Sequence, residues 1–150
     1  ISSDNSKYNF QSRNIVKCVI NIIGLGNIEI YSVHLGWNSD KLNQTENLMN
    51  WQNETKEDNI IAKIITGDFN NYPNSDVYKY ITEKFNYSDE YIKVNLNGMF
   101  DKTMVSLNER IDYIFTKTSI LKPKEVKRIF TGKDNITVSD HYGLFSVFLI

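Results

Sequence analysis

Apolar, β-branched segments alternate along the chain with short polar clusters, and this pattern predicts both strands and helices. We expect strands near residues 13–22, 28–35, 59–66, 110–116 and 142–150. The third segment is almost continuously apolar, which is typical of a central strand buried on both faces. Between the first two strands, Gly24-Leu25-Gly26-Asn27 has the residues of a hairpin turn.

Two further segments carry apolar residues at helical spacing. Residues 39–57 are expected to form a helix that Ser39 or Asp40 would cap, and residues 75–86 a second one that Asn74 or Ser75 would cap. Residues 87–109 are mostly polar and are expected to form a long loop with little regular structure. Loops of this length inside compact domains are often functional.

The order of these elements predicts an α/β fold with mixed strand directions, not a regular alternation of parallel strands and helices. Five strands and two helices would leave one sheet face or edge uncovered. Exposed sheet edges need a partner or protection. We therefore expect an incompletely covered sheet.

The length of 150 residues corresponds to one domain, and 41% hydrophobic residues indicate a globular chain. No apolar run approaches the roughly 20 residues of a membrane span. Residues 1–10 are polar and lack the apolar core of a signal peptide, so a cytoplasmic location is expected. Because the chain does not begin with Met, we interpret it as a piece whose true N-terminus is not visible.

Charge and cysteine content narrow the function classes only slightly. The net charge of −1 gives no overall attraction to nucleic acid. Basic residues gather between Lys117 and Lys133, where they form either a solvated rim or a patch that attracts phosphate. Cys18 is the only cysteine, so neither an internal disulfide nor a cysteine-based zinc site can form, and it is interpreted as a small buried hydrophobe.

Candidate chemistry lies at the strand ends, because four of the expected strands have a His or Asp at or next to one end. Such an arrangement gathers acids, bases and metal-binding groups at one rim of a sheet. The residues are His34, Asp68 and Asn70 in Gly67-Asp68-Phe69-Asn70, Asp112 in Arg110-Ile111-Asp112-Tyr113, and Asp140 and His141 in Ser139-Asp140-His141.

Taken alone, each cluster also has a plain structural interpretation. Asp68 and Asn70 can align a water molecule or contact a divalent cation, or they can simply form a turn. His34 can equally be an ordinary core or surface residue. Asp112 can fix the tautomer of the His141 imidazole, or it can cap the next turn.

Asp140 and His141 are expected to contact different groups, because adjacent side chains on a strand point to opposite faces. Asp140 would then contact a group such as a cation, while His141 would face Asp112.

As a set, these residues resemble the endonuclease/exonuclease/phosphatase superfamily of metal-dependent phosphoesterases. The resemblance rests on Gly67-Asp68-Phe69-Asn70 after an apolar strand, on Arg110-Ile111-Asp112-Tyr113-Ile114-Phe115, and on Ser139-Asp140-His141 before the last strand, and it extends from Arg13 to the C-terminus. It implies a deoxyribonuclease I-like, four-layer α/β/β/α sandwich with mixed, largely antiparallel sheets. It also implies hydrolysis of a phosphate ester by activated water, with Mg²⁺ or Mn²⁺ as cofactor.

The resemblance further implies a role for each residue. Those in contact with water or phosphate would be Asp68, which orients and deprotonates the attacking water, Asn70, which holds Asp68 and a phosphoryl oxygen, and His141 and His34, which contact the phosphate. Asp112 would be the carboxylate partner of His141, and Asp140 would contribute to the metal site. Trp37 and Arg110 are candidate substrate-binding residues.

One part of the family pattern is missing from this sequence. In the family, the main metal ligands are an Asn and a Glu from the first half of the domain, and no such pattern precedes Arg13. We therefore interpret residues 1–150 as a partial domain that lacks its N-terminal half. The uncovered sheet face would pack against that half or cause self-association.

Substrate preference is the least constrained property. The segments around His34-Leu35-Gly36-Trp37 and Phe130-Thr131-Gly132-Lys133-Asp134 look most similar to a branch that includes maltose 6'-phosphate phosphatase. Trp37 could stack on a sugar face, or be an ordinary buried aromatic. The expected substrate is a small phosphorylated metabolite such as a sugar phosphate. The alternatives are a nuclease, which three Arg residues in the chain disfavour, a sphingomyelinase-like phosphodiesterase, and an inactive half-domain.

Overall fold

A computed structural model of the protein describes residues 13–37, 40–55, 57–132 and 138–150. The strands are β1 (Ile15–Ile22), β2 (Gly26–His34), β3 (Ile60–Asp68), β4 (Ser88–Asp89), β5 (Asp112–Thr118), β6 (Lys122–Ile129) and β7 (Gly143–Leu149). The helices are α1 (Lys41–Glu54), α2 (Asp76–Lys79), which continues as a π-helical turn (Tyr80–Lys84), α3 (Glu90–Val94) and a 3₁₀ turn (Gly98–Phe100).

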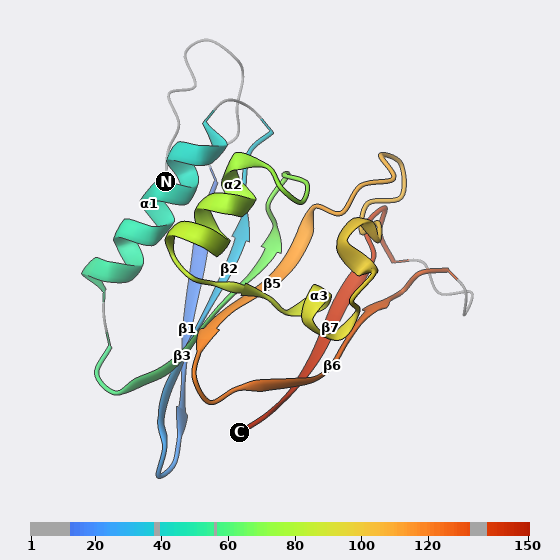
Figure 1. Ribbon diagram of the computed structural model, residues 1–150. Coiled ribbons are helices and arrows are strands. Elements are labelled where there is room, and N and C mark those ends of the chain that lie inside the picture. Colours follow the sequence, from blue (N-terminus) through green and yellow to red (C-terminus); the bar gives the residue numbers. More distant parts are fainter. Residues whose placement is uncertain (1–12, 38–39, 56, 133–137) are drawn as a thin grey trace.

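The strands form two sheets, as Figure 1 shows. The larger has the order β1-β2-β3-β5-β4, and the smaller pairs β6 with β7. Strands β2 and β3 run parallel, whereas β1–β2 and β3–β5 are antiparallel. The predicted α/β fold with mixed strand directions is confirmed.

Helices α1 and α2 cover one face of the larger sheet (Figure 1). The main core lies between these helices and the sheet. There, alternate strand residues such as Tyr31, Ile65 and Phe115 pack against Leu48 and Ile81 from the helices. Ser75 caps α2 as predicted, because its hydroxyl accepts a hydrogen bond from the N–H of Tyr78 (3.3 Å). For α1, the alternative cap Ser39 lies outside the described residues.

The opposite face of the larger sheet packs against the β6–β7 pair. Ile114 of β5 and Ile64 of β3 meet Val126 of β6 and Phe148 of β7 in a smaller apolar cluster. Strand residues therefore alternate between a large core under the helices and a smaller one under the second sheet. The parity of a residue in β2, β3 or β5 decides which of the two it faces.

Five predicted strands, both predicted helices and the hairpin are confirmed, with shifts of up to three residues at their ends. The prediction of a loop over residues 87–109 is wrong in part, because β4, α3 and the 3₁₀ turn lie there. Strand β6 was also missed. Its alternating Lys residues and Pro123 look like a solvated segment, yet lysine and proline are what protected edge strands carry.

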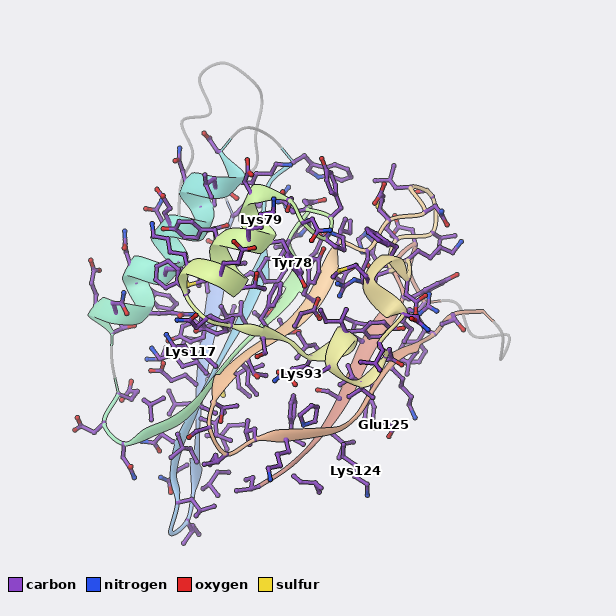
Figure 2. All side chains as sticks on the ribbon, in the orientation of Figure 1. Tyr78, Lys79, Lys93, Lys117, Lys124 and Glu125 are labelled. Atoms are coloured by element: carbon purple, nitrogen blue, oxygen red, sulfur yellow. The ribbon has the colours of Figure 1, made fainter. Side chains whose placement is uncertain are left out.

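Of the basic residues between Lys117 and Lys133 that the structure describes, Lys117 lies on β5, and the other four lie on β6: Lys122, Lys124, Lys127 and Arg128. Figure 2 shows Lys117 and Lys124 well apart. Lys127 pairs with Glu125 (2.6 Å) and Arg128 with Asp101 (3.4 Å), so carboxylates offset part of this charge, which favours the solvated rim. Lys133 lies outside the described residues.

Strand β1 leaves apolar side chains in solvent. The prediction that Cys18 is buried is wrong: it is exposed on this edge strand, opposite Ile30, on the face turned away from the helices. Val16 and Ile20 on the same face are 65% and 42% exposed. The expected uncovered sheet region is therefore present at β1. None of the helices among the described residues is long and apolar enough to cross a membrane.

A buried ion cluster ties β1, β2 and β3 together on the helix side of the sheet. The carboxylate of Glu29 is fully buried and lies 2.9 Å from the Lys17 ammonium and 3.1 Å from that of Lys63. The Tyr31 hydroxyl donates a third contact at 2.8 Å. Burial raises the pKa of Glu29, but these three partners outweigh it and the net shift is downward.

Glu29→Gln should lower the free energy of unfolding at pH 7 by about 3 kcal/mol, because it removes the carboxylate partner of the largely buried Lys63 ammonium and leaves Lys17 with the half-exposed Glu57 (3.3 Å). A carboxyl with a lowered pKa in the folded state stabilises above its ordinary pKa, about 4.3, and loses that contribution as the pH falls through the folded value. The gap between wild type and variant should therefore shrink from pH 7 to pH 3.5 in urea titrations. Glu83→Gln, at an exposed position, is the control. Equal gaps at both pH values would contradict this account.

Candidate active site

Three site residues stand in one row because of strand pairing. In the pairing of β2 with β3, His34 lies opposite Asp68, and in the pairing of β3 with β5, Asp68 lies opposite Asp112. Directly paired residues point to the same face, so the three side chains are neighbours. By parity with Ile64 and Ile114, they lie on the face turned toward β6 and β7.

His141 reaches this row from the other sheet, since it lies two residues before the start of β7. Its Nδ1 lies 2.9 Å from Asp112 Oδ2. The carboxylate favours a proton on Nδ1, which leaves Nε2 for a substrate or a proton. At the other end of the row, His34 Nε2 lies 3.5 Å from Asp68 Oδ2. Two imidazole–carboxylate pairs thus stand side by side at one rim.

Asp68 and Asn70 are held by a local turn. The Asp68 Oδ1 accepts a hydrogen bond from the backbone N–H of Asn70 (2.8 Å), and the Asn70 side-chain amide donates to the carbonyl of Leu35 (2.8 Å). Asn70 adopts a positive φ of 49°, a conformation that Asn tolerates well. Its buried Oδ1 has no hydrogen-bond partner among the described residues, so a polar acceptor is left available beside Asp68.

The electrostatics of the row shift two groups in the same direction. Burial raises the pKa of Asp68; the Asn70 N–H acts against this, and the charge of Asp112 raises the pKa further, so the net shift is upward. Burial lowers the pKa of His141, but its hydrogen bond to Asp112 and the charges of Asp112 and Asp68 outweigh burial, and the net shift is also upward. Asp68 is thereby a stronger base than an ordinary carboxylate.

Oxygen and nitrogen ligands suitable for a divalent cation converge at the same place. One ligand atom from each of Asp68, Asp112 and His141 lies within 4.8 Å of the other two. Carboxylate and amide oxygens suit Mg²⁺ and Mn²⁺, and the unpartnered Asn70 Oδ1 would add one such atom. Because Asp112 Oδ2 is engaged by His141, Asp68 and Asn70 are the better candidates on this chain. The residues present fit a divalent cation.

Two candidates stand apart from this cluster. Asp140 is exposed, and its carboxylate contacts the Ser139 hydroxyl (3.2 Å) rather than the Asp68–Asp112–His141 group. Trp37 is 58% exposed, so it is not the buried aromatic of the structural interpretation, and its indole is accessible next to the strand that ends at His34.

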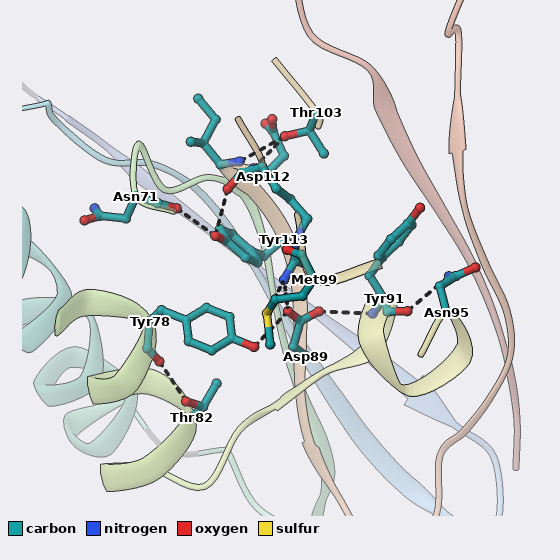
Figure 3. Close-up of polar contacts among 12 residues, drawn as sticks. Asn71, Tyr78, Thr82, Asp89, Tyr91, Asn95, Met99, Thr103, Asp112 and Tyr113 are labelled. Atoms are coloured by element: carbon teal, nitrogen blue, oxygen red, sulfur yellow. Dashed lines mark hydrogen bonds and ion pairs between the residues drawn. The ribbon is translucent and has the colours of Figure 1, made fainter. Parts of the chain in front are cut away.

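Arg110 requires a correction, because its guanidinium is enclosed in the protein. Only 1% of Arg110 is exposed; its Nη2 lies 2.6 Å from Asp89 Oδ2, and its Nε donates to the carbonyl of Met99 (2.8 Å). The Tyr78 hydroxyl donates to the same Asp89 oxygen at 3.1 Å. Figure 3 shows Tyr78, Asp89 and Met99 gathered below Asp112. With 1% of its surface exposed, Arg110 has no face free for a substrate in this arrangement.

Thr103, which contacts the backbone of Asp112, is a functional candidate that no sequence pattern predicts. Its hydroxyl accepts hydrogen bonds from the N–H groups of Ile111 (3.0 Å) and Asp112 (3.1 Å), as Figure 3 shows. Thr103 lies in the polar segment predicted to be a loop, where nothing in the local pattern distinguishes it from neighbouring polar residues.

The chain matches the model of a known protein family over most of its length. The model of the Endonuclease/Exonuclease/phosphatase family matches residues 7–141. The chain belongs to this family. Members of the family are hydrolases that act on phosphate esters, and the predicted family resemblance is confirmed. No curated protein matches the sequence.

Several solved structures share the fold. A family protein from Leptotrichia buccalis is 28% identical with a TM-score of 0.71, covering 91% of this chain and 54% of its own. The human Nocturnin catalytic domain with bound sulfate is 23% identical with a TM-score of 0.73, covering 93% and 54%. The mannosyl-6-phosphatase from Bacteroides thetaiotaomicron is 20% identical with a TM-score of 0.60, covering 83% and 52%. The chain spans about half the length of these structures.

Asp112→Asn should lower the pKa of His141, because it removes the charge and weakens the hydrogen bond that raise this pKa while burial, which lowers it, remains. The measurement is an NMR titration of the ring protons with a chelator present, and His141→Gln assigns the signal among the two histidines of the chain. Asp76→Asn, the same charge change at an exposed position of α2, should leave the pKa of His141 in place. An unchanged value in Asp112→Asn would mean that the pair does not form in solution.

Proposed function

We propose that the whole protein carrying this chain is a divalent-metal-dependent phosphoesterase that cleaves a small phosphorylated metabolite, such as a sugar phosphate, by attack of water. The observation that carries the proposal is the row of His34, Asp68, Asp112 and His141 at one rim. Two imidazole–carboxylate pairs, at 2.9 and 3.5 Å, suit the binding of a phosphoryl group and the removal of a proton from water. Family membership supports the same reaction class.

Asp68 is the proposed base, since its raised pKa lets it take a proton from the attacking water. His141, oriented by Asp112, would hold the phosphate through Nε2 and stabilise the charge that develops on its oxygens. His34 would contact the phosphate from the other end of the row. A bound Mg²⁺ or Mn²⁺ ion would neutralise charge on the phosphate oxygens, and Asn70, with Asp140 through water, would help to hold it on this chain.

A sugar phosphate is favoured by the exposed aromatic ring of Trp37, 58% exposed, which lies three residues after His34. Aromatic faces of this kind suit the apolar face of a sugar ring. The fold is shared with a mannosyl-6-phosphatase, which adds support. It is also shared with TDP2 in complex with single-stranded DNA, so DNA is the substrate to test in parallel.

The whole protein should release phosphate from hexose or disaccharide phosphates when Mg²⁺ is present. Asp68→Asn should reduce kcat by about 10²–10⁴-fold, because the base is lost while the shape of the side chain is kept. Trp37→Ala should raise KM for sugar phosphates more than it raises KM for small phosphate esters that lack a sugar ring. Equal or better cleavage of plasmid DNA at the same enzyme concentration would move the assignment to a nuclease.

We further propose that residues 1–150 are the C-terminal part of a larger domain and that the remaining part supplies the main metal ligands. The chain spans about half of the solved structures it matches, and the apolar side chains of Val16 and Ile20 on β1 are exposed. Contiguous exposed apolar surface on a sheet edge favours a protein contact. In the isolated chain the same surface would favour self-association.

The 150-residue chain alone should therefore hydrolyse phosphate esters weakly or not at all, even with excess Mg²⁺ or Mn²⁺, and should associate in solution. The measurements are phosphatase assays and the solution mass, compared with the whole protein. Val16→Lys, placed in the exposed part of β1, should reduce association without touching the catalytic row. Robust turnover by a monomeric chain that Asp68→Asn abolishes would show that no further ligands are needed.

A further inference from the structure

The two halves of the central His–Asp pair come from different sheets. Asp112 begins β5 in the larger sheet, and His141 precedes β7 in the smaller one. A 2.9 Å hydrogen bond between them requires the two sheets to be held in place at this rim. Residues 103–105, which we call the strap, lie between the two segments.

On one side, the strap is bonded to the segment that carries His141. The carbonyl of Thr103 accepts a hydrogen bond from the N–H of Tyr142 (2.6 Å), and the N–H of Val105 donates to the carbonyl of Asp140 (3.0 Å). Met104, between them, forms a β-bridge with His141 itself. The backbone on both sides of the imidazole is thereby fixed to the strap.

On its other side, the strap is bonded to the start of β5. The N–H groups of Thr103 and Met104 donate to the carbonyl of Glu109 (2.9 and 3.0 Å). The Thr103 hydroxyl accepts from the N–H groups of Ile111 and Asp112 (3.0 and 3.1 Å; Figure 3). Thr103 is fully buried, so water cannot replace these bonds without opening the structure.

We propose that Thr103 is a positioning residue that sets the distance between the Asp112 carboxylate and the His141 imidazole. Its hydroxyl holds the backbone of Asp112, and its carbonyl holds the backbone of Tyr142, next to His141. This role rests on the proposed phosphoesterase function. Thr103 acts through the backbone, so it is not itself a catalytic residue.

Strand β5, which begins at Asp112, offers a matched control at its other end, where Thr118 lies. The Thr118 hydroxyl also accepts from two successive backbone N–H groups, those of Ile120 (3.1 Å) and Leu121 (3.2 Å). Thr118→Val therefore removes the same kind of bond pair as Thr103→Val, at the end of β5 away from Asp112, together with the bond that the Thr118 hydroxyl donates to the carbonyl of Ile61 (3.1 Å). The two variants separate positioning of the site from general loss of stability.

In the whole protein, Thr103→Val should reduce kcat about 10–100-fold, because small displacements of catalytic groups are costly, while KM changes less than about threefold. Thr103→Ser, which keeps the hydroxyl, should stay within about threefold of wild type. Thr118→Val should lose comparable thermal stability with kcat unchanged. Equal loss of kcat in the two Val variants would overturn the proposal.

If Thr103→Val does not fold, Thr103→Cys is the alternative variant, because its thiol is a weaker hydrogen-bond acceptor than a hydroxyl. The kcat of Thr103→Cys should then fall below that of Thr103→Ser. Equal values of kcat would count against a role for the hydroxyl.

A second readout does not depend on activity. In Thr103→Val, but not in Thr118→Val, NMR should show faster hydrogen exchange at the amides of Asp112 and Tyr142 and a weakened signal from the His141 Nδ1 proton. Unchanged exchange and an unchanged ring proton would overturn the proposal. If the wild-type protein hydrolyses no phosphate ester, the proposed function fails, and these signals still decide whether Thr103 holds the pair together.

Discussion

The close approach of β2 to β3 at Gly67 is the constraint on which the site depends. Gly67 has a φ of 134°, and a Cβ at this position would lie 2.0 Å from the carbonyl oxygen of Val33. No side chain fits there, so glycine is required one residue before Asp68. This contact accompanies the register in which His34 faces Asp68 and Asp68 faces Asp112. A slip by one residue would turn these side chains to the helix-covered face, into the main core.

The row also explains why the carboxylates remain useful so close together. Like charges on neighbouring strands repel, and Asp112 contributes to the raised pKa of Asp68. The imidazole of His141 offsets this charge at one end, while His34 faces Asp68 at the other. A row with two adjacent carboxylates at its centre can accept a dianionic phosphate only if positive charge is added, which is the physical reason to expect a cation between Asp68 and the substrate.

The sequence was informative where a strong local pattern coincided with chemistry. The apolar run before Asp68 identified a central strand, and polar residues at strand ends identified the rim. It failed where the structure depends on distant partners. Arg110 lies in a motif that suggested substrate contact, but Asp89, which encloses it, comes from a segment read as loop. The apolar neighbours of Cys18 in the sequence favour a buried position. However, β1 is an edge strand, and its side chains on the face turned away from the helices are exposed. The lysines of β6 are typical of a solvated segment, so the sequence pattern does not predict this strand.

Side chains needed for the proposed chemistry are thus present, but the frame that holds them is shared between two sheets. His141 is tied to Asp112 through the strap and through the apolar contacts of Ile114 with Val126 and Phe148. That second cluster is smaller than the core beneath the helices, so it contributes less burial energy to the alignment. Any segment that packs on the exposed apolar face of β1 would stiffen both sheets. The proposed remaining part of the domain would therefore act on catalysis in two ways, through the metal ligands proposed for it and through the geometry of a His–Asp pair that this chain already contains.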